Sequence, residues 1–284
     1  MVMKNWKAYL FILPAFALYG SFILVPSIQN VVYSFFHWTT LTEGTFNGIK
    51  NYIELFKDKV FGLALLHNVI WAALTILFPL IVGLVLAVTL SKLKSRVVLS
   101  TIYFIPATIP FVVSGIIWGW IYNPIFGLLN QFLRGVGLEN LTRSWIGDRK
   151  IALYALNILG GWTFYGFCAV IFMSSLQNLD QSIYDAAKID GASNLQTFFH
   201  ITIPSLKGTI IFLMIYSIIG AMKFFDIVYI TTKGGPGYST EILGTYIFKL
   251  AFRQQRQGYS SSVAVVLLIL VMTLSVIMLR RREK

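Results

Sequence analysis

The chain has 284 residues, of which 57% are hydrophobic and only 12% are charged. Soluble domains carry about 25% charged residues, so this composition excludes an ordinary soluble domain and indicates that lipid surrounds most of the chain. The net charge of +12 would suggest nucleic-acid binding in a soluble protein, but here most basic residues flank apolar segments, which indicates lipid headgroups instead.

Six apolar segments have about the length that a transmembrane helix needs. The first, residues 9–33, follows Lys4 and Lys7 without a small-x-small cleavage site, so we expect a retained anchor. The other five are residues 68–90, 98–122, 151–176, 209–230 and 263–279. We therefore predict an all-α integral membrane protein with six transmembrane helices, which form a single transmembrane domain over residues 1–284.

Three segments between and within these spans have a composition of their own. Residues 37–59 are rich in charge and predict a loop, whereas residues 98–122 contain Pro106 and Pro110 near the start of a span. Pro14 and Pro26 lie in the first span, where neighbouring helices would have to satisfy the backbone groups that such prolines free. Residues 240–252 have helical apolar spacing, which predicts an amphipathic helix on a membrane or complex surface, or a short helix packed on the bundle rim.

The basic residues near span ends indicate the orientation. Six spans place both termini on one side, and Lys and Arg are equally numerous on the two sides. The tight turn Lys92–Arg96 and the run Arg280–Arg282 lie directly at span ends, where positive charge favours the cytoplasm. We therefore predict cytoplasmic termini, with residues 180–204 on the cytoplasmic side.

Residues 180–204 form the polar interruption between the fourth and fifth spans, and they contain several helix signals. Asp180 is suited to cap a short helix, and Gly191 to end it in the left-handed conformation. One face of that helix collects Ile183, Ala186, Ala187 and Asp190. The two alanines would let the backbone of another protein approach closely. Ser193 is suited to cap a second helix, and Pro204 to begin the next span.

Motifs for catalysis and metal binding are absent from the sequence. No Gly-Lys dipeptide exists to form a Walker A phosphate loop, and no Gly-x-Ser-x-Gly is present. His37, His67 and His200 are isolated, and the single cysteine, Cys168, excludes a disulfide framework. We expect no catalytic residue, metal or cofactor on this chain, so active transport would take its energy from a partner or an ion gradient.

Lys223 and Asp226 are the ionisable pair inside the predicted fifth span. A charge there costs about 2.5–3.5 kcal/mol, and the three-residue spacing allows a pair on one helix face. The pair is either a structural ion pair or part of a translocation path. Aromatic candidates for the same path are Trp162, Tyr165, Phe225 and Tyr229. A carboxylate beside aromatic faces suits a sugar, although each aromatic taken alone is better explained by core packing or lipid contact.

The spacing Asp185-Ala186-Ala187, then Gly191, Ile201 and Pro204 resembles the EAA loop of binding-protein-dependent ABC importer permeases. Asp185 replaces the usual Glu, and Ile203 replaces Leu. The resemblance implies a coupling helix that docks into a cleft of an ATPase subunit. The implied coupling residues are Asp185, Ala186, Ala187, Asp190, Gly191 and Ala192.

A second stretch, Phe225–Tyr229 followed by Gly234-Gly235-Pro236 and Thr240, resembles the end of the fifth span in MalF/UgpA-like carbohydrate permeases. This resemblance implies a sugar or oligosaccharide as cargo. It also implies that Gly234, Gly235 and Pro236 lie near a docked solute-binding protein.

The resemblance further implies a larger assembly in a bacterial or archaeal cell (inner) membrane. Its other parts would be a second homologous permease subunit, a cytoplasmic ABC ATPase dimer that binds ATP and Mg, and an extracellular or periplasmic solute-binding protein. One alternative is an ABC permease for a non-sugar solute such as glycerol-3-phosphate, for which Lys223 would serve an anion, or a polyamine. The other is an ion-coupled secondary transporter, which would need a repeat of broken helices and more charges at the membrane midplane, whereas the chain offers one charged pair and no second copy of it.

Overall fold

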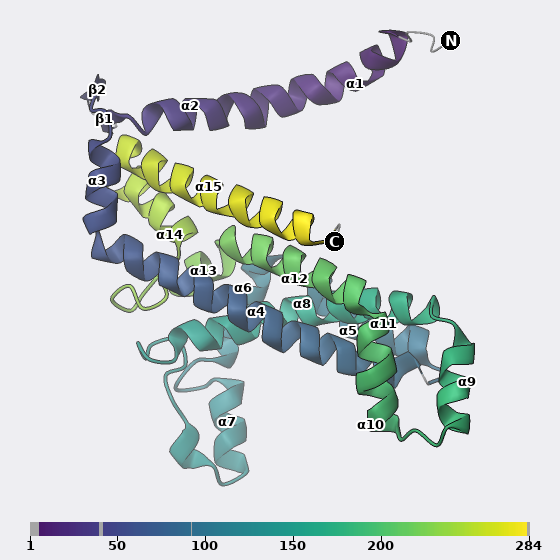
Figure 1. Cartoon of the computed structure of the whole chain (residues 1–284). Coiled ribbons are helices and arrows are strands. Elements are labelled where there is room, and N and C mark those ends of the chain that lie inside the picture. Colours follow the sequence, from purple (N-terminus) through teal and green to yellow (C-terminus); the bar gives the residue numbers. More distant parts are fainter. Residues whose placement is uncertain (1–5, 40–41, 92, 283–284) are drawn as a thin grey trace. The chain divides into compact units, whose positions relative to one another are not determined.

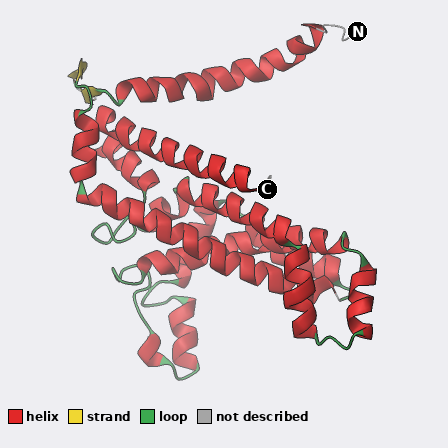
Figure 2. Ribbon diagram, viewed as in Figure 1, coloured by secondary structure: helices red, strands yellow, loops and turns green. Residues whose placement is uncertain are grey.

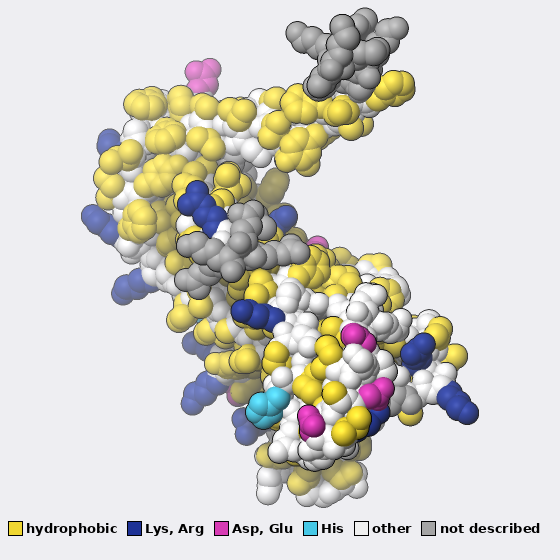
Figure 3. Space-filling model, turned by 45° about the vertical axis from the view of Figure 1, so that its right-hand side comes forward, with side chains coloured by type: hydrophobic (Ala, Val, Ile, Leu, Met, Phe, Trp, Pro, Cys, Tyr) yellow, Lys and Arg dark blue, Asp and Glu magenta, His cyan; other side chains and the backbone are white. Residues whose placement is uncertain are grey.

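The computed structural model describes residues 6–39, 42–91 and 93–282. Helices make up most of this part of the chain (Figures 1 and 2), so the predicted helical membrane protein is confirmed at the level of fold class. Hydrophobic side chains cover much of the face drawn in Figure 3, as expected for a surface in contact with lipid. Lys4, which precedes the first apolar segment, and Lys92, which begins the basic turn used for the orientation, lie outside the described residues.

Four described helices are long and apolar enough to cross a membrane: Phe11–Tyr33, Lys59–Ser91, Ala152–Gln177 and Gln257–Met278. Two further pairs reach this length only as bent spans. They are Arg96–Thr108 with Phe111–Ile121, at 95°, and Asn194–Ser205 with Lys207–Met222, at 66°. The described residues therefore contain between four and six spans, where the sequence predicts six.

The described chain divides into two compact units, the first from Met1–Gly62 and Tyr246–Leu270 and the second from Leu63–Thr245 and Val271–Lys284. In chain order the elements are α1 (Trp6–Tyr19), a π-helical turn (Gly20–Leu24), α2 (Val25–Tyr33), β1 (Phe36–Thr39), β2 (Thr42–Phe46), α3 (Lys50–Lys57), α4 (Lys59–Ser91), α5 (Arg96–Thr108), α6 (Phe111–Ile121), α7 (Leu128–Gly135), a 3-10 turn (Glu139–Leu141), α8 (Ala152–Gln177), α9 (Gln181–Ile189), α10 (Asn194–Thr197), a π-helical turn (Phe198–Thr202), α11 (Ile203–Ser205), α12 (Lys207–Met222), α13 (Asp226–Thr231), α14 (Leu243–Phe248), a π-helical turn (Lys249–Arg253) and α15 (Gln257–Arg282).

The first unit corrects the prediction of a loop at residues 37–59. Strands β1 and β2 pair antiparallel there, with Phe36 opposite Phe46, and helix α3 follows. The Asn51 side chain explains why this segment forms regular structure. Its Nδ2 donates to the backbone oxygens of Ser34, at 2.8 Å, and Phe36, at 2.9 Å. Asn51 is 3% exposed, so a buried amide ties α3 to the end of α2 and to the hairpin.

Asp58 ties the α3–α4 junction to α14 and α15 within the same unit. Its Oδ2 accepts hydrogen bonds from the hydroxyls of Tyr246 and Tyr259, the latter at 2.7 Å. Partial burial raises the pKa of the Asp58 carboxyl, but these two hydrogen bonds and those from the Val60 and Phe61 backbone stabilise the carboxylate, so the net pKa is lowered.

The second unit packs α8 closely against α4 and α5 at glycines. A Cβ at Gly83 of α4 would lie 2.6 Å from the Cβ of Cys168, and a Cβ at Gly166 of α8 would overlap the carbonyl of Tyr103. Small residues allow such close approach of membrane helices. The core beside these contacts consists of Leu80, Ala87, Leu90, Cys168, Phe172, Met173, Leu206 and Leu213.

The predicted third span is broken rather than continuous. Helix α5 ends before Ile109, which has extended dihedrals (φ −80°, ψ 128°), and α6 begins after Pro110. Proline disfavours the helical conformation of the residue before it and lacks an N–H for the helix ladder. The proline that the sequence places near the start of this span therefore divides it.

The helix of the predicted fifth span, residues 209–230, ends at Met222. Asn68 of α4 forms hydrogen bonds with the backbone groups near this end. Its Nδ2 donates to the carbonyl of Ala221 near the end of α12, at 3.0 Å, and its Oδ1 accepts from the N–H of Leu243 at the start of α14, at 2.8 Å. Asn68 is fully buried. A buried amide thus replaces helix bonds at two helix ends, as broken membrane helices require.

Candidate functional site

The segment 180–204 begins with a capped helix, as the sequence predicts. The Asp180 carboxylate accepts the N–H of Ser182 at 2.9 Å and caps α9. This backbone hydrogen bond lowers the pKa of Asp180, because it stabilises the charged form. Asp180 therefore defines where the polar segment begins after α8.

Gly191 ends α9 in the left-handed conformation, with φ +73°. Its N–H donates to the carbonyl of Lys188 at 3.1 Å, and the N–H of Ala192 donates to the carbonyl of Ala187 at 2.9 Å. These two bonds form a Schellman motif, which satisfies the last carbonyls of the helix. The motif turns the chain sharply, so the second half of the segment comes back beside α9.

The second half begins with a capping box at α10. The Ser193 N–H donates to the Gln196 side chain at 2.8 Å, and Ser193 Oγ accepts the Gln196 N–H at 3.3 Å. The hydroxyls of Tyr184 and Thr202 lie 3.3 Å apart, which connects α9 to the π-helical turn. Pro204 lies in α11, and the chain bends before α12 begins at Lys207.

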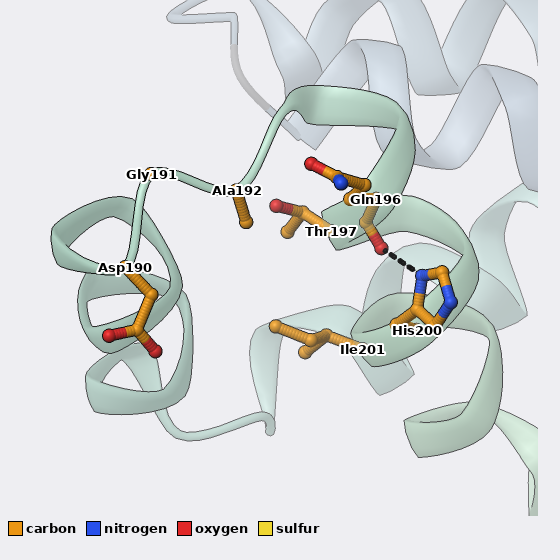
Figure 4. A pocket seen from close by; sticks show the side chains of 7 residues that line it. All are labelled: Asp190, Gly191, Ala192, Gln196, Thr197, His200 and Ile201. Carbon is orange, nitrogen blue, oxygen red and sulfur yellow. Dashed lines mark hydrogen bonds between the residues drawn. The ribbon is translucent and has the colours of Figure 1, made fainter.

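An open cleft of about 380 Å³ lies between these two arms. Figure 4 shows Asp190 on the α9 arm and His200 on the other arm, where its Nδ1 lies 3.1 Å from the Gln196 carbonyl oxygen. The side chains of Ala192, Thr197 and Ile201 point into the space between the arms (Figure 4). The cleft is therefore lined by both apolar and polar groups: Ala192 and Ile201, the Thr197 hydroxyl, the Gln196 amide, one carboxylate and one imidazole.

The exposed side chains of the segment 180–204 include one ion pair and several large apolar groups. Asp185 pairs with Lys188 at 2.9 Å, with exposed fractions of 57% and 71%, and the hydrogen bond from Lys188 lowers the pKa of Asp185. Four large apolar side chains of the same segment are also exposed: Ile183 at 46%, Ile189 at 87%, Leu195 at 70% and Phe199 at 57%.

Ala187 corrects the expected docking face of α9. The sequence places it with Ile183, Ala186 and Asp190, but Ala187 is only 6% exposed, whereas the other three are exposed. The chain itself covers Ala187, so Ala186 is the alanine that remains open to another protein.

Lys223 and Asp226 do not form the pair on one helix that the spacing predicts. Lys223 follows the last residue of α12, Asp226 begins α13, and Phe225 between them has φ −146°. Both charged side chains are exposed, and no ion pair joins them in the described part of the chain. The break that Asn68 stabilises is the physical reason, because it takes the two residues off one continuous helix.

The aromatic candidates belong to two separate groups. Trp162 of α8 contacts Trp118 at 5.7 Å between ring centroids, and Tyr165 contacts Tyr103 at 6.4 Å. Phe225 and Tyr229 stack on each other at 5.0 Å. Trp162 and Tyr165 therefore each meet an aromatic neighbour edge-on, whereas Phe225 and Tyr229 stack on each other.

Phe224 is the residue that reaches α8. Its ring stacks on Trp71 at 4.5 Å and meets Phe111 edge-on at 5.7 Å. A Cβ at Gly160 of α8 would lie 3.9 Å from the Phe224 ring. The sequence groups Phe224 with Phe225 and Tyr229 around Lys223 and Asp226, but its contacts with Trp71 and Phe111 follow only from the fold.

The Gly-Gly-Pro turn is only partly available to a partner. Gly234 has φ +80° and is buried, and a Cβ there would overlap the carboxylate of Glu241. Gly235 and Pro236 are half-buried. The turn is closed internally, because Thr240 Oγ1 donates to the Gly235 carbonyl at 2.7 Å. Of the three predicted docking residues, Gly234 is thus covered by the chain itself.

His67 and Glu241 form a buried polar contact that the sequence reasoning did not single out. The His67 ring nitrogen Nδ1 lies 2.8 Å from the Glu241 backbone oxygen, and both residues are buried. The adjacent Asn68 belongs to the same network. The signal available in the sequence was a His-Asn pair at the start of an otherwise apolar run, since buried polar groups need partners.

Comparisons with known proteins match this architecture. Residues 80–282 match the family described as "Binding-protein-dependent transport system inner membrane component". The chain is 39% identical over 276 residues to the Bacillus subtilis (strain 168) protein described as "Probable ABC transporter permease protein YurN", covering 96% of this chain and 94% of that one. It is 33% identical to the lactose transport system permease protein LacF of Rhizobium radiobacter, covering 95% and 91%.

A solved structure has the same fold over nearly the whole chain. It is that of a bacterial ABC transporter involved in the import of the acidic polysaccharide alginate. The TM-score is 0.85 and the sequences are 19% identical, and the superposition covers 99% of this chain and 96% of that chain.

Proposed function

We propose a cargo, partners and a coupling role for this chain on the premise that it belongs to the binding-protein-dependent transport system inner membrane components, a family whose match covers residues 80–282. It is an integral membrane protein and the permease subunit of an ABC importer. The observation that supports the proposal best is the conformation of residues 180–204. In this segment two capped helical arms border an open cleft, and large apolar side chains of the segment are exposed.

The segment 180–204 is the coupling element in this proposal. ATP binding to a separate ATPase dimer would move α9 and the cleft beside it, and α8 and α12 would transmit the motion, because they continue directly from the two ends of the segment. The Schellman turn at Gly191 and the capping box at Ser193 support this role, because locally satisfied helix ends keep the two arms rigid. Asp185, with its carboxylate exposed, is the polar contact to the ATPase.

The cargo is a sugar or oligosaccharide. The lactose permease of Rhizobium radiobacter, which is similar over 95% of this chain, supports this class. Asp226 is exposed and adjoins the Phe225–Tyr229 stack. Its carboxylate can accept hydrogen bonds from sugar hydroxyls while the aromatic face packs on the sugar ring. Exposed Lys223 keeps an anionic cargo such as glycerol-3-phosphate as the alternative.

The assembly contains a second, homologous permease subunit, an ATPase dimer and a solute-binding protein outside the cell membrane. Both termini and the segment 180–204 face the cytoplasm, which the basic residues at span ends favour. Tyr238, which is 41% exposed beside the Gly-Gly-Pro turn, is on the opposite side, where the binding protein docks.

Affinity purification of the tagged chain from native membranes in mild detergent tests the proposal. Mass spectrometry should find a Walker-containing ATPase and a second multi-span permease with it. A co-purified binding protein is then screened by calorimetry against sugars, glycerol-3-phosphate and polyamines. Recovery of this chain alone, active in transport as a homo-oligomer, would overturn the ABC assignment of partners, and binding of only a non-sugar solute would overturn the cargo.

A further inference from the structure

Helix α3 has an exposed apolar face that lies outside all candidate spans. Ile49, Ile53 and Phe56 follow one another at helical spacing and are 62%, 48% and 77% exposed. Phe46, at the end of β2, is 75% exposed. These four side chains, which we call the α3 face, have no role in the coupling segment or the candidate path.

Contacts on the other side of α3 keep this face turned outward. Leu55 is fully buried, and the Asn51 amide donates to the backbone oxygen of Phe36 at 2.9 Å. Glu54 pairs with Arg256 at 2.6 Å. Rotation of α3 to bury Ile53 or Phe56 would break the Asn51 hydrogen bond and expose Leu55, so these two buried contacts hold the α3 face outward.

The chain connections place α3 at the boundary of the membrane. The candidate span Phe11–Tyr33 ends shortly before β1, and the span Lys59–Ser91 begins two positions after α3 ends at Lys57. Helix α4 has 33 residues, which is about 50 Å at 1.5 Å per residue. The hydrocarbon core is about 30 Å thick, so the start of α4 extends into the headgroup region, and α3 adjoins it there. Water alone would therefore not surround the α3 face.

Two lysines border the α3 face and indicate what covers it. Lys50 and Lys57 are exposed, and at 100° per residue they project next to Ile53 on the same edge of the helix. Lysines extend from an apolar surface toward lipid phosphates in this arrangement. An apolar stripe with a basic edge is the pattern of a helix that lies in a membrane interface.

We propose that the α3 face inserts into the boundary between lipid headgroups and acyl chains, with Lys50 and Lys57 on lipid phosphates. The anchor holds the start of α4 and the β1–β2 hairpin at the membrane surface. The inference needs only that α4 spans the membrane, so it does not depend on the cargo or on the coupling role of residues 180–204.

Nitroxide depth measurements on the full importer test the proposal. The complex is reconstituted in mixed vesicles of phosphatidylcholine and phosphatidylglycerol, with a spin label at Ile53→Cys or Phe56→Cys. Glu54→Cys is the matched control on the same helix, and its exposed ion pair contributes little to stability. Native Cys168 is fully buried, and protein without an added cysteine should take up no label.

Labels at positions 53 and 56 should be more accessible to oxygen than to a water-soluble nickel complex, at about 5–10 Å below the phosphates. The label at position 54 should show the opposite preference. Equal nickel access at 53, 56 and 54 would overturn the proposal in favour of a water-exposed face. Access to neither reagent would overturn it in favour of a protein partner. In the double variant Lys50→Gln/Lys57→Gln the label at 56 should become shallower, and an unchanged depth would overturn the contact of the lysines with phosphate.

Discussion

Gly191 allows the coupling role to be tested through backbone conformation alone. It has φ +73°, and a Cβ at this position would meet no heavy atom within 4 Å. A substitution therefore adds backbone strain without a steric clash. For a residue with a Cβ the left-handed conformation costs about 1–2 kcal/mol, which changes a conformational equilibrium about 5- to 30-fold.

The strain should depend on the residue in a defined order. Asn tolerates the left-handed region, Ala tolerates it less, and a β-branched Val least. Gly191→Pro is the extreme, because proline fixes φ near −65° and removes the N–H that donates to Lys188 at 3.1 Å. We expect uptake per ATP hydrolysed to fall in the order Gly, Asn, Ala, Val, Pro, while membrane abundance stays constant.

The assay is ATP hydrolysis and labelled-sugar uptake by the complex reconstituted in vesicles, with abundance measured by immunoblot. Gly208→Ala is the matched control, because its added Cβ also meets no atom within 4 Å and its φ is not in the left-handed region. Wild-type uptake by Gly191→Val and Gly191→Pro would refute the coupling role of this turn. A parallel loss of abundance would show that Gly191 is needed for folding instead.

Three further predictions follow from buried or charged groups. Asn68→Leu removes Oδ1, which accepts the Leu243 N–H at 2.8 Å. The buried N–H is then left without its partner, so the free energy of unfolding should fall by about 1–3 kcal/mol. An unchanged melting temperature of the complex in detergent would contradict this. Asp58 has a lowered pKa, so its stabilising contribution is complete above its ordinary carboxyl pKa and is lost as pH falls through the lower folded-state value. The melting temperature of Asp58→Asn should therefore lie below that of wild type at neutral pH, and the difference between the two should shrink below about pH 4. A difference that does not change with pH would contradict a stabilising role of the Asp58 carboxylate. Asp226, exposed at the start of α13, should affect sugar uptake more than abundance when changed to Ala, and equal losses of both would indicate a structural residue.

The local features of the candidate site were predictable because their signals are local. Asp180, Gly191 and Ser193 each act within four residues of their own position. Capping depends on one side chain or one backbone angle near a helix end. The sequence alone was therefore sufficient to predict both arms of the segment 180–204.

The errors arise where tertiary contacts, rather than local helix signals, determine the outcome. Lys223 and Asp226 have the spacing of a helical pair, but Asn68, more than 150 positions earlier, bonds to Ala221 where that helix ends. Gly234 was expected to be available to a partner, but Glu241 fills the space beside it. Residues 37–59 were polar enough to predict a loop, whereas Asn51 organises a hairpin and a helix through the Ser34 and Phe36 carbonyls.

Photo-crosslinking from the segment 180–204 tests the central claim most directly. A photoreactive residue at Ile189, which is 87% exposed, is compared with one at Phe132 of α7, which is 62% exposed. Illumination of native membranes should join position 189, but not position 132, to a Walker-containing ATPase, and ATP should change the yield. Absence of an ATPase adduct from position 189, in membranes where sugar uptake is intact, would contradict the account.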